Sequence, residues 1–244
     1  MDLSYQQLAE IIREKINSNE YVALPSEREL AKSFDVSRSL VRSAIEQLCT
    51  EGILKKYHGK GTYIMLKDID DSSKHFKGMS ELLKKAGYDP SSKILNTMTR
   101  KAGYKFSKIF DVSEDTEIFE VLRLRLGNGQ PISIENTYIL HDSIPDIENI
   151  DFQIYSLYDL FRTNNIKIQD ISHAFSTTKV HNTDARFLNL ENDTSVIYVD
   201  ITSSLIDNQV VEYTEVLVRP EFSKYYTDGI FKNGIYQVNA QVVI

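Results

Sequence analysis

The chain has 244 residues, of which 41% are apolar and 26% charged, and a formal charge of −7. These values are typical of a globular protein of one or two domains with enough apolar residues for a core. The single cysteine, Cys49, excludes a disulfide framework and a cysteine-rich zinc site. No apolar run reaches the roughly 18 residues of a membrane span. The amphipathic N-terminus contains acids and does not resemble a signal peptide, so we expect a cytoplasmic protein.

The negative charge is not evenly distributed along the chain. Residues 1–66 contain nine basic and nine acidic side chains, whereas residues 67–244 contain 19 and 26. Within the first segment, residues 37–66 hold five basic groups against two acids, an excess of three positive charges. A polyanionic partner would therefore bind this short stretch rather than the rest of the chain.

The first 50 residues predict three helices. Apolar side chains recur at helical spacing over about residues 5–18. Ser26, with Glu29 three residues later, forms a capping-box pattern that starts a second helix, which ends near residue 35. Ser37 is placed to cap a third helix, whose apolar stripe runs from Leu40 to Leu48 and stops before a glycine.

A β-hairpin follows these helices. Residues 53–57 and 62–65 have the composition of short strands, and the turn between them, residues 58–61, contains two glycines. Three helices and a hairpin in about 65 residues are the parts of a winged helix-turn-helix. In that arrangement the third helix enters the DNA major groove.

The start of the third helix carries side chains suited to DNA. Arg38 and Arg42 are four residues apart and share one helical face, opposite the apolar stripe. Arginine binds guanine bidentately or contacts phosphate, and the free N–H groups at a helix start add affinity for anions. The tip of the hairpin, from His58 to Lys60, is small and basic, as a minor-groove contact requires. The alternative is an ordinary solvated helix face with an ordinary hairpin.

Residues 67–78 are polar without periodicity, which predicts a linker. The remaining residues, 79–244, alternate between strand and short-helix patterns, which predicts an α+β domain with a largely antiparallel sheet. The expected strands are 92–101, 117–127, 131–140, 168–180, 194–206 and 210–219, and the expected helices are 79–86, 104–111, 156–164 and 182–189.

Two arginines lie on one predicted strand of this domain. Arg123 and Arg125 are two residues apart, so both point to the same face of the sheet. Such a pair is costly unless it is solvated or paired, and a phosphate or carboxylate ligand would pair with both. Ser156 begins a predicted helix and could hold an anion. Alternatively, Arg123 pairs with Glu135 across the sheet and Ser156 is only a helix cap.

Several short motifs resemble the DNA-binding domain of GntR-family bacterial regulators. They are Leu-Pro-Ser-Glu-Arg-Glu-Leu-Ala at 24–31, Val-Ser-Arg-Ser-Leu-Val-Arg at 36–42, Leu48, Glu51-Gly52 and Gly-Lys-Gly-Thr-Tyr at 59–63. The resemblance implies that the second helix touches a phosphate through Arg28. In the third helix, this chain has Ser39 where the family usually has a threonine, and the serine keeps the hydroxyl. The predicted DNA-binding residues are Arg28, Ser37, Arg38, Ser39, Arg42, His58, Gly59 and Lys60.

The larger domain resembles the UTRA ligand-binding domain of the HutC subfamily. The residues that carry this are 121–125, 130–135, 155–158, 211–213 and 218–220. The resemblance implies a chorismate-lyase-like fold, an effector site and dimerisation. By similarity to members that sense sugar phosphates, the effector-binding residues are Thr97, Arg123, Arg125, Glu135, Ser156, Tyr158 and Glu212, with Thr99 a weaker candidate. Val218 and Pro220 depart from the family pattern, so the resemblance does not transfer a hexosamine-phosphate specificity.

These observations predict a homodimeric transcriptional regulator, in this branch usually a repressor. It would bind a palindromic double-stranded operator and respond to a small anionic effector, with a sugar phosphate favoured. The alternatives are a small-molecule enzyme of chorismate-lyase-like architecture and a metabolite-binding module that joins another protein. The five histidines fall at no metal-ligand spacing, and no nucleotide or nucleophile motif occurs. We therefore expect no metal, no cofactor, no membrane contact and no enzymatic activity.

Overall fold

The computed structural model describes residues 3–18, 20, 21, 24–57, 61–65, 79–222, 224–232 and 235–243. The chain divides near residue 75 into two compact units, and each is considered by itself. The predicted linker, residues 67–78, lies outside the described residues. Within the part of the chain that is described, no helix is long and apolar enough to cross a membrane.

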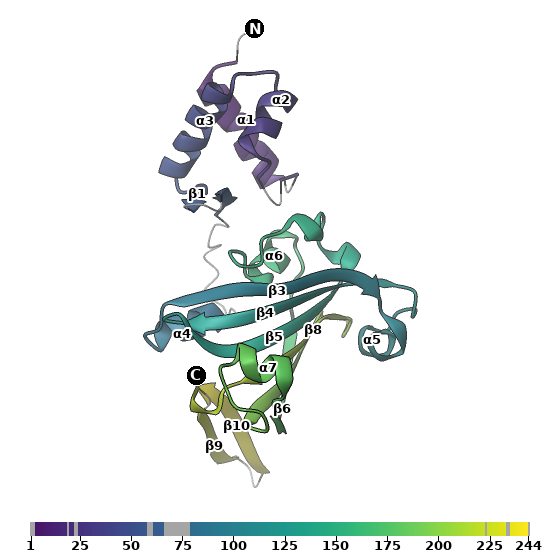
Figure 1. Cartoon of the computed structure of the whole chain (residues 1–244). Helices are drawn as coiled ribbons and strands as arrows, with labels where there is room; N and C mark the ends of the chain where they lie inside the picture. The colour runs from purple at the N-terminus through teal and green to yellow at the C-terminus, as the bar shows by residue number, and fades with distance from the viewer. Residues whose placement is uncertain are drawn as a thin grey trace. The chain divides into compact units, whose positions relative to one another are not determined.

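The N-terminal unit contains the three predicted helices (Figure 1). They are α1 (Tyr5–Asn17), α2 (Glu27–Ser33) and α3 (Arg38–Thr50). The capping box of α2 is present, because Ser26 and Glu29 exchange hydrogen bonds between side chain and backbone. Ser37 caps α3 by accepting from the backbone N–H of Leu40. The local sequence thus determines where both helices begin.

One apolar core holds this unit together. It includes fully buried side chains from all three helices, such as Leu8, Leu30 and Leu48. The hairpin of β1 (Leu54–Tyr57) and β2 (Gly61–Ile64) adds Leu54 and Ile64 to the same core. The turn between the two strands, with the predicted residues His58, Gly59 and Lys60, lies outside the described residues.

The C-terminal unit is built on a six-stranded sheet with the order β3-β4-β5-β8-β7-β6, in which every neighbouring pair is antiparallel. The helix α4 (Met79–Lys85) precedes it. The strands are β3 (Pro90–Lys101), β4 (Glu117–Gly127), β5 (Gln130–Leu140), β6 (Asp170–Lys179), β7 (Ser195–Ser204) and β8 (Val210–Val218). The predicted α+β class with an antiparallel sheet is confirmed.

Helices cover the two faces of this sheet differently. Phe106 of α5 (Gly103–Phe110) and Ala185 of α7 (Asn182–Phe187) pack at separate places on one face, against Ile118 and Leu124 respectively (Figure 1). The segment before α6 (Leu157–Thr163) contacts the opposite face, where the rings of Phe119 and Phe152 stack at 5.9 Å. It also contains the 3-10 turns η1 (His141–Ser143) and η2 (Ile147–Asn149).

The last part of the chain was not anticipated. After β8 comes a third 3-10 turn, η3 (Pro220–Phe222), and then a separate antiparallel hairpin of β9 (Lys224–Lys232) and β10 (Ile235–Val243). The sequence analysis assigned no element beyond residue 219. The signals of a hairpin were present in the sequence and were not used. Asn233-Gly234 is a turn dipeptide, and apolar and polar residues alternate from Tyr236 to Val242.

Candidate functional site

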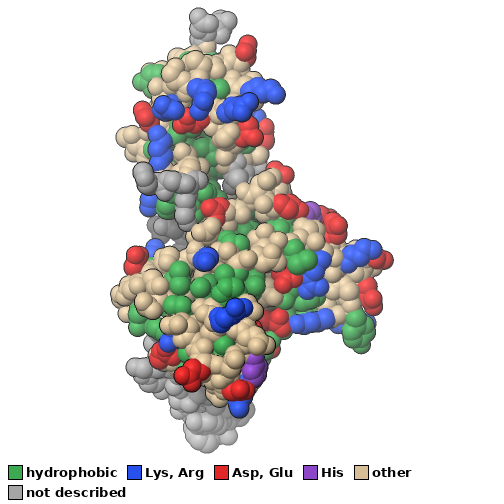
Figure 2. Space-filling view, in the orientation of Figure 1, with side chains coloured by type: hydrophobic (Ala, Val, Ile, Leu, Met, Phe, Trp, Pro, Cys, Tyr) green, Lys and Arg blue, Asp and Glu red, His purple; other side chains and the backbone are tan. Residues whose placement is uncertain are grey.

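The predicted DNA-facing residues of α3 lie on its exposed side. Val41, Ala44 and Leu48 are buried in the core, and Ser37, Arg38, Ser39 and Arg42 are exposed. Arg28 is also exposed, on the first turn of α2. Figure 2 shows Lys and Arg side chains on the surface of this unit with acidic side chains between them.

An acidic residue that the sequence analysis did not select joins the two arginines of α3. Glu27, the first residue of α2, binds Arg42 with two contacts, 3.0 Å to Nη2 and 3.5 Å to Nε. It also lies 4.0 Å from Nη2 of Arg38. The hydrogen bond from Arg42 and the charges of Arg42, Arg38 and Lys56 hold the pKa of Glu27 below its usual range. The sequence could have indicated Glu27 as a candidate, because it directly precedes Arg28 at the start of the same helix.

The second candidate site is a buried group on the sheet, which we call the arginine cluster: Arg123, Arg125 and Glu135. Both guanidinium groups bind the same carboxylate oxygen, Oε2 of Glu135, at 3.0 Å from Nη2 of Arg123 and 2.8 Å from Nε of Arg125. Register explains the meeting, because Arg123 and Glu135 are directly opposite each other on β4 and β5. The pairing of Arg123 with Glu135 across the sheet, which the sequence analysis gave as the alternative to a ligand contact, is therefore present.

This pairing leaves part of Arg123 unsatisfied. Its side chain is 4% exposed, and its Nε and Nη1 atoms find no hydrogen-bond partner among the described residues. Ser133, on the neighbouring strand, has an equally buried hydroxyl without a partner in the described part of the chain. Buried polar atoms are normally paired, because an unpaired one costs about 1–3 kcal/mol. A ligand that accepts hydrogen bonds would remove this cost.

The charges of the cluster do not cancel. Two guanidinium groups face one carboxylate, which leaves one positive charge in excess within the cluster. The carboxyl of Glu212 also acts on Arg123, but burial raises its pKa and so disfavours the charged form that would cancel the excess. Burial and the charge of Arg125 lower the pKa of Arg123 to about 10, so it stays protonated near neutral pH. Burial would raise the pKa of Glu135, but the charges of both arginines outweigh it and keep the pKa below its usual range. The arrangement favours an anionic ligand.

Glu212 lies on the same face with a different environment. Its carboxylate accepts hydrogen bonds from Ser203 at 2.5 Å and from Thr214 at 2.8 Å. Burial raises the pKa of Glu212 despite these bonds, which favours its neutral form. The hydroxyl of Tyr158, from α6, lies 3.4 Å from that of Ser203, and burial raises the pKa of this tyrosine too.

The other predicted effector residues are placed less centrally. Thr97 is exposed on β3, an edge strand, opposite Val121 of β4. Ser156 is half-buried just before α6, and its backbone carbonyl accepts from the N–H of Leu160. Thr99 donates to Glu148. The sequence analysis missed the hydroxyl side chains around the arginines and Glu212. Two of them, Ser92 and Ser203, lie on neighbouring strands, opposite Arg125 and Glu212. The alternation of side chains along the strands could have indicated the others: Ser133, Thr137 and Thr214.

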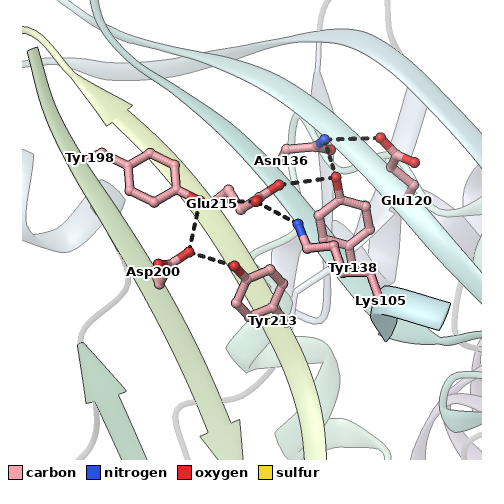
Figure 3. A network of polar contacts seen from close by, with 8 residues as sticks. All are labelled: Lys105, Glu120, Asn136, Tyr138, Tyr198, Asp200, Tyr213 and Glu215. Atoms are coloured by element: carbon pink, nitrogen blue, oxygen red, sulfur yellow. Dashed lines mark hydrogen bonds and ion pairs between the residues drawn. The ribbon is translucent and has the colours of Figure 1, made fainter. Parts of the chain in front are cut away.

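The opposite face of the sheet carries a second polar group, which we call the tyrosine cluster (Figure 3). Three tyrosine hydroxyls lie within hydrogen-bond distance of carboxylates there. Tyr213 donates to Asp200 at 2.5 Å and Tyr138 to Glu215 at 3.3 Å, and the single proton of Tyr198 is shared between Asp200 and Glu215, each at 2.9 Å. Lys105 of α5 binds Glu215 at 2.7 Å, and Asn136 joins Tyr138 to Glu120. The cluster fastens α5 to four strands.

Comparison with protein families covers both units. The model of the UTRA domain matches residues 85–223, and that of the "Bacterial regulatory proteins, gntR family" matches residues 4–64. The repressor NagR of Bacillus subtilis is 26% identical over 219 residues, which cover 88% of this chain and 90% of that protein. The regulator GmuR of the same organism is 27% identical, with 86% and 91% covered.

Solved structures show the same fold. PhnF from Mycobacterium smegmatis has a TM-score of 0.57 at 18% identity, over 88% of this chain and 95% of that one. The possible transcriptional regulator YydK from Bacillus subtilis has a TM-score of 0.54 at 21% identity, over 93% and 99%. At these identities the likeness concerns the fold alone.

A three-helix unit with a hairpin and an antiparallel sheet domain together define a two-part, DNA-binding transcriptional regulator. The chain belongs to the GntR family, in the branch that carries a UTRA domain. It is a regulator and not an enzyme, as the sequence predicted.

Proposed function

We propose that the protein is a homodimeric repressor whose operator affinity is controlled by a small anionic metabolite, with a sugar phosphate favoured. The observation that carries the effector class is Arg123, a buried cation with two unpartnered nitrogen atoms in the described part of the chain. A phosphate accepts several hydrogen bonds at once and neutralises the excess charge. The name of one relative, the probable fructoselysine utilization operon transcriptional repressor of Escherichia coli, supports a carbohydrate-derived effector.

The dimer follows from the DNA side of the proposal. One recognition helix of 13 residues reads only a few base pairs, and two of them related by a twofold axis read a palindrome. The UTRA domain would join the two copies, and residues 67–78 would carry the effector's influence to the DNA-binding units. This is a coupling free energy between two sites, so operator DNA must weaken effector binding by the same factor.

The DNA contacts are tested with a labelled duplex from the protein's own upstream region, monitored by fluorescence anisotropy. Arg38→Ala and Arg42→Ala should abolish the preference for this duplex over a scrambled one. The contacts of Arg28, Ser37 and Ser39 should contribute affinity through phosphates and the α3 N-terminus. Unchanged selectivity in both arginine variants would contradict the assignment.

The effector site is tested by titrating sugar phosphates, amino sugars and small carboxylates into the preformed complex. Release by one phosphorylated sugar in the wild type should be lost in Arg123→Met, whereas operator binding without the compound should remain. Arg100→Met is a matched control, because Arg100 pairs with Glu120 on the other face of the same sheet. An Arg123→Met variant released at the wild-type concentration would refute the arginine cluster as the effector site.

A further inference from the structure

We propose that Glu27 determines the sequence selectivity of the DNA-binding unit, by positioning Arg42 for base contact and by opposing attachment to phosphates alone. This inference rests on the proposed DNA-facing role of α3. Glu27 belongs to α2, and its contact with Arg42 joins residues 15 positions apart in the chain.

The carboxylate of Glu27 is not required for the helix start at which it lies. The two hydrogen bonds of the α2 capping box are made by Ser26 and Glu29. The Glu27 side chain reaches α3 instead and is only 26% exposed, whereas the side chains of Arg38 and Arg42 are 64% and 57% exposed. The arginines therefore extend further into solvent than the acid that holds them.

The geometry of the pair decides which part of Arg42 remains available. Glu27 takes the edge of the guanidinium formed by Nε and Nη2. A guanidinium has five N–H donors in a fixed plane, so the edge formed by Nη1 and the second hydrogen of Nη2 stays open. Those two parallel donors can bind O6 and N7 of guanine. The pair thus fixes the orientation of the arginine and leaves a bidentate edge for a base.

The charge of Glu27 has a second consequence. It faces Arg42, Arg38 and Lys56, three of the cations on the basic part of this unit. Near DNA a carboxylate repels phosphates, so it weakens every complex that relies on phosphate contacts alone. At the correct sequence the base contacts of a correctly oriented Arg42 offset this penalty. Selectivity, the ratio of the two affinities, therefore increases.

The experiment uses the full-length protein and two duplexes. A randomised duplex pool is selected on the wild type, and the winning duplex is compared with a scrambled duplex of equal composition over a range of salt concentrations. For Glu27→Gln, the affinity for the scrambled duplex should rise about threefold and its salt dependence should steepen by about one phosphate contact. The selectivity ratio should fall about tenfold, which is within the range of one bidentate arginine–guanine contact.

Two further variants separate positioning from charge. Glu27→Asp keeps the charge but is one methylene too short for the bidentate contact, so its selectivity should also fall while its affinity for the scrambled duplex stays unchanged. Glu46→Gln is the matched control, because Glu46 lies exposed on α3, pairs with Lys56 at 3.6 Å and acts on Arg42 through its charge alone, without a hydrogen bond to it. It should change both affinities equally and leave the ratio intact.

The outcomes distinguish the two levels of the proposal. A wild type that selects no preferred duplex would refute the proposed DNA contacts themselves. A selective wild type whose ratio survives in both Glu27 variants would overturn only the role of Glu27. If Glu27→Gln and Glu46→Gln changed the selectivity ratio equally, net charge alone would explain the effect, and the proposal that Glu27 positions Arg42 would be wrong. Thermal unfolding of each variant shows that it is folded at the assay temperature.

Discussion

The two faces of the six-stranded sheet hold polar clusters that differ in charge and in how well their hydrogen bonds are satisfied. The arginine cluster has an excess positive charge and a buried guanidinium with two unpartnered nitrogen atoms within the described structure. In the tyrosine cluster each tyrosine and each carboxylate has a partner, and among its buried side-chain atoms in the described structure only Oδ1 of Asn136 has none.

This difference separates a site that can accept a ligand from one that holds the fold together. A network whose hydrogen bonds are all made gains no stability from a new partner, whereas an unsatisfied buried donor is stabilised by one. The tyrosine cluster joins α5 to the sheet through side chains from five elements, including Lys105 and Glu215. The variants below compare the two faces, from the largest expected effect to the smallest.

Glu135→Ala should give the largest loss of stability. It removes the carboxylate that pairs with both Arg123 and Arg125, and leaves two buried positive charges side by side. Breaking a buried ion pair on one side costs roughly 3–5 kcal/mol, which urea unfolding measures. Glu215→Ala on the tyrosine face should cost less, about 1–2 kcal/mol, because Lys105 can turn to solvent. Equal losses would remove the distinction between the faces.

Glu212 should make stability depend on pH. Burial raises its pKa in the folded protein above the ordinary value of 4.5, so the folded state holds the proton more tightly. Its stabilising contribution is therefore complete below pH 4.5 and is lost as the pH rises through the folded-state pKa. Relative to Glu212→Gln, the wild type should lose at most about 1.4 kcal/mol per pH unit in this window. Urea unfolding of both proteins from pH 4 to 8 measures the difference, and parallel curves would contradict the shift.

Tyr213→Phe should lower the free energy of unfolding by about 1 kcal/mol, the value of one hydrogen bond. It removes the donor at 2.5 Å from Asp200, which keeps its bond from Tyr198. Effector response should not change, because the side chain faces away from the arginine cluster. Tyr104→Phe is the control, since Tyr104 is 73% exposed and should show no loss. A Tyr213→Phe protein with altered effector release would show that the two faces are coupled.

Lys105→Met should lower the free energy of unfolding least, by about 0.5 kcal/mol. Lys105 binds Glu215 and lies 5.0 Å from the ring centre of Phe106, but its side chain is 51% exposed. Salt should shrink the loss, because solvent-exposed charges are screened. Thermal unfolding at low and high salt measures it. A loss above that of Tyr213→Phe would mean that the lysine is a central part of the cluster.

The sequence by itself determined the local features of this protein. Ser26, Glu29 and Ser37 mark helix starts because a cap needs only residues three positions away. Arg123 and Arg125 share a face because strand side chains alternate with period two. The resemblance to GntR regulators with a UTRA domain was also carried by short local motifs, and the family comparison confirmed it.

Only the tertiary structure decided which side chains meet. The pairing of Glu27 with Arg42 depends on how two helices pack, and the tyrosine cluster joins residues from 105 to 215. The sharing of one Glu135 oxygen by both arginines depends on the register of β4 against β5. Periodicity tells which face a side chain takes but not which strand lies beside it. Because of that register, Nε and Nη1 of Arg123 have no hydrogen-bond partner among the described residues.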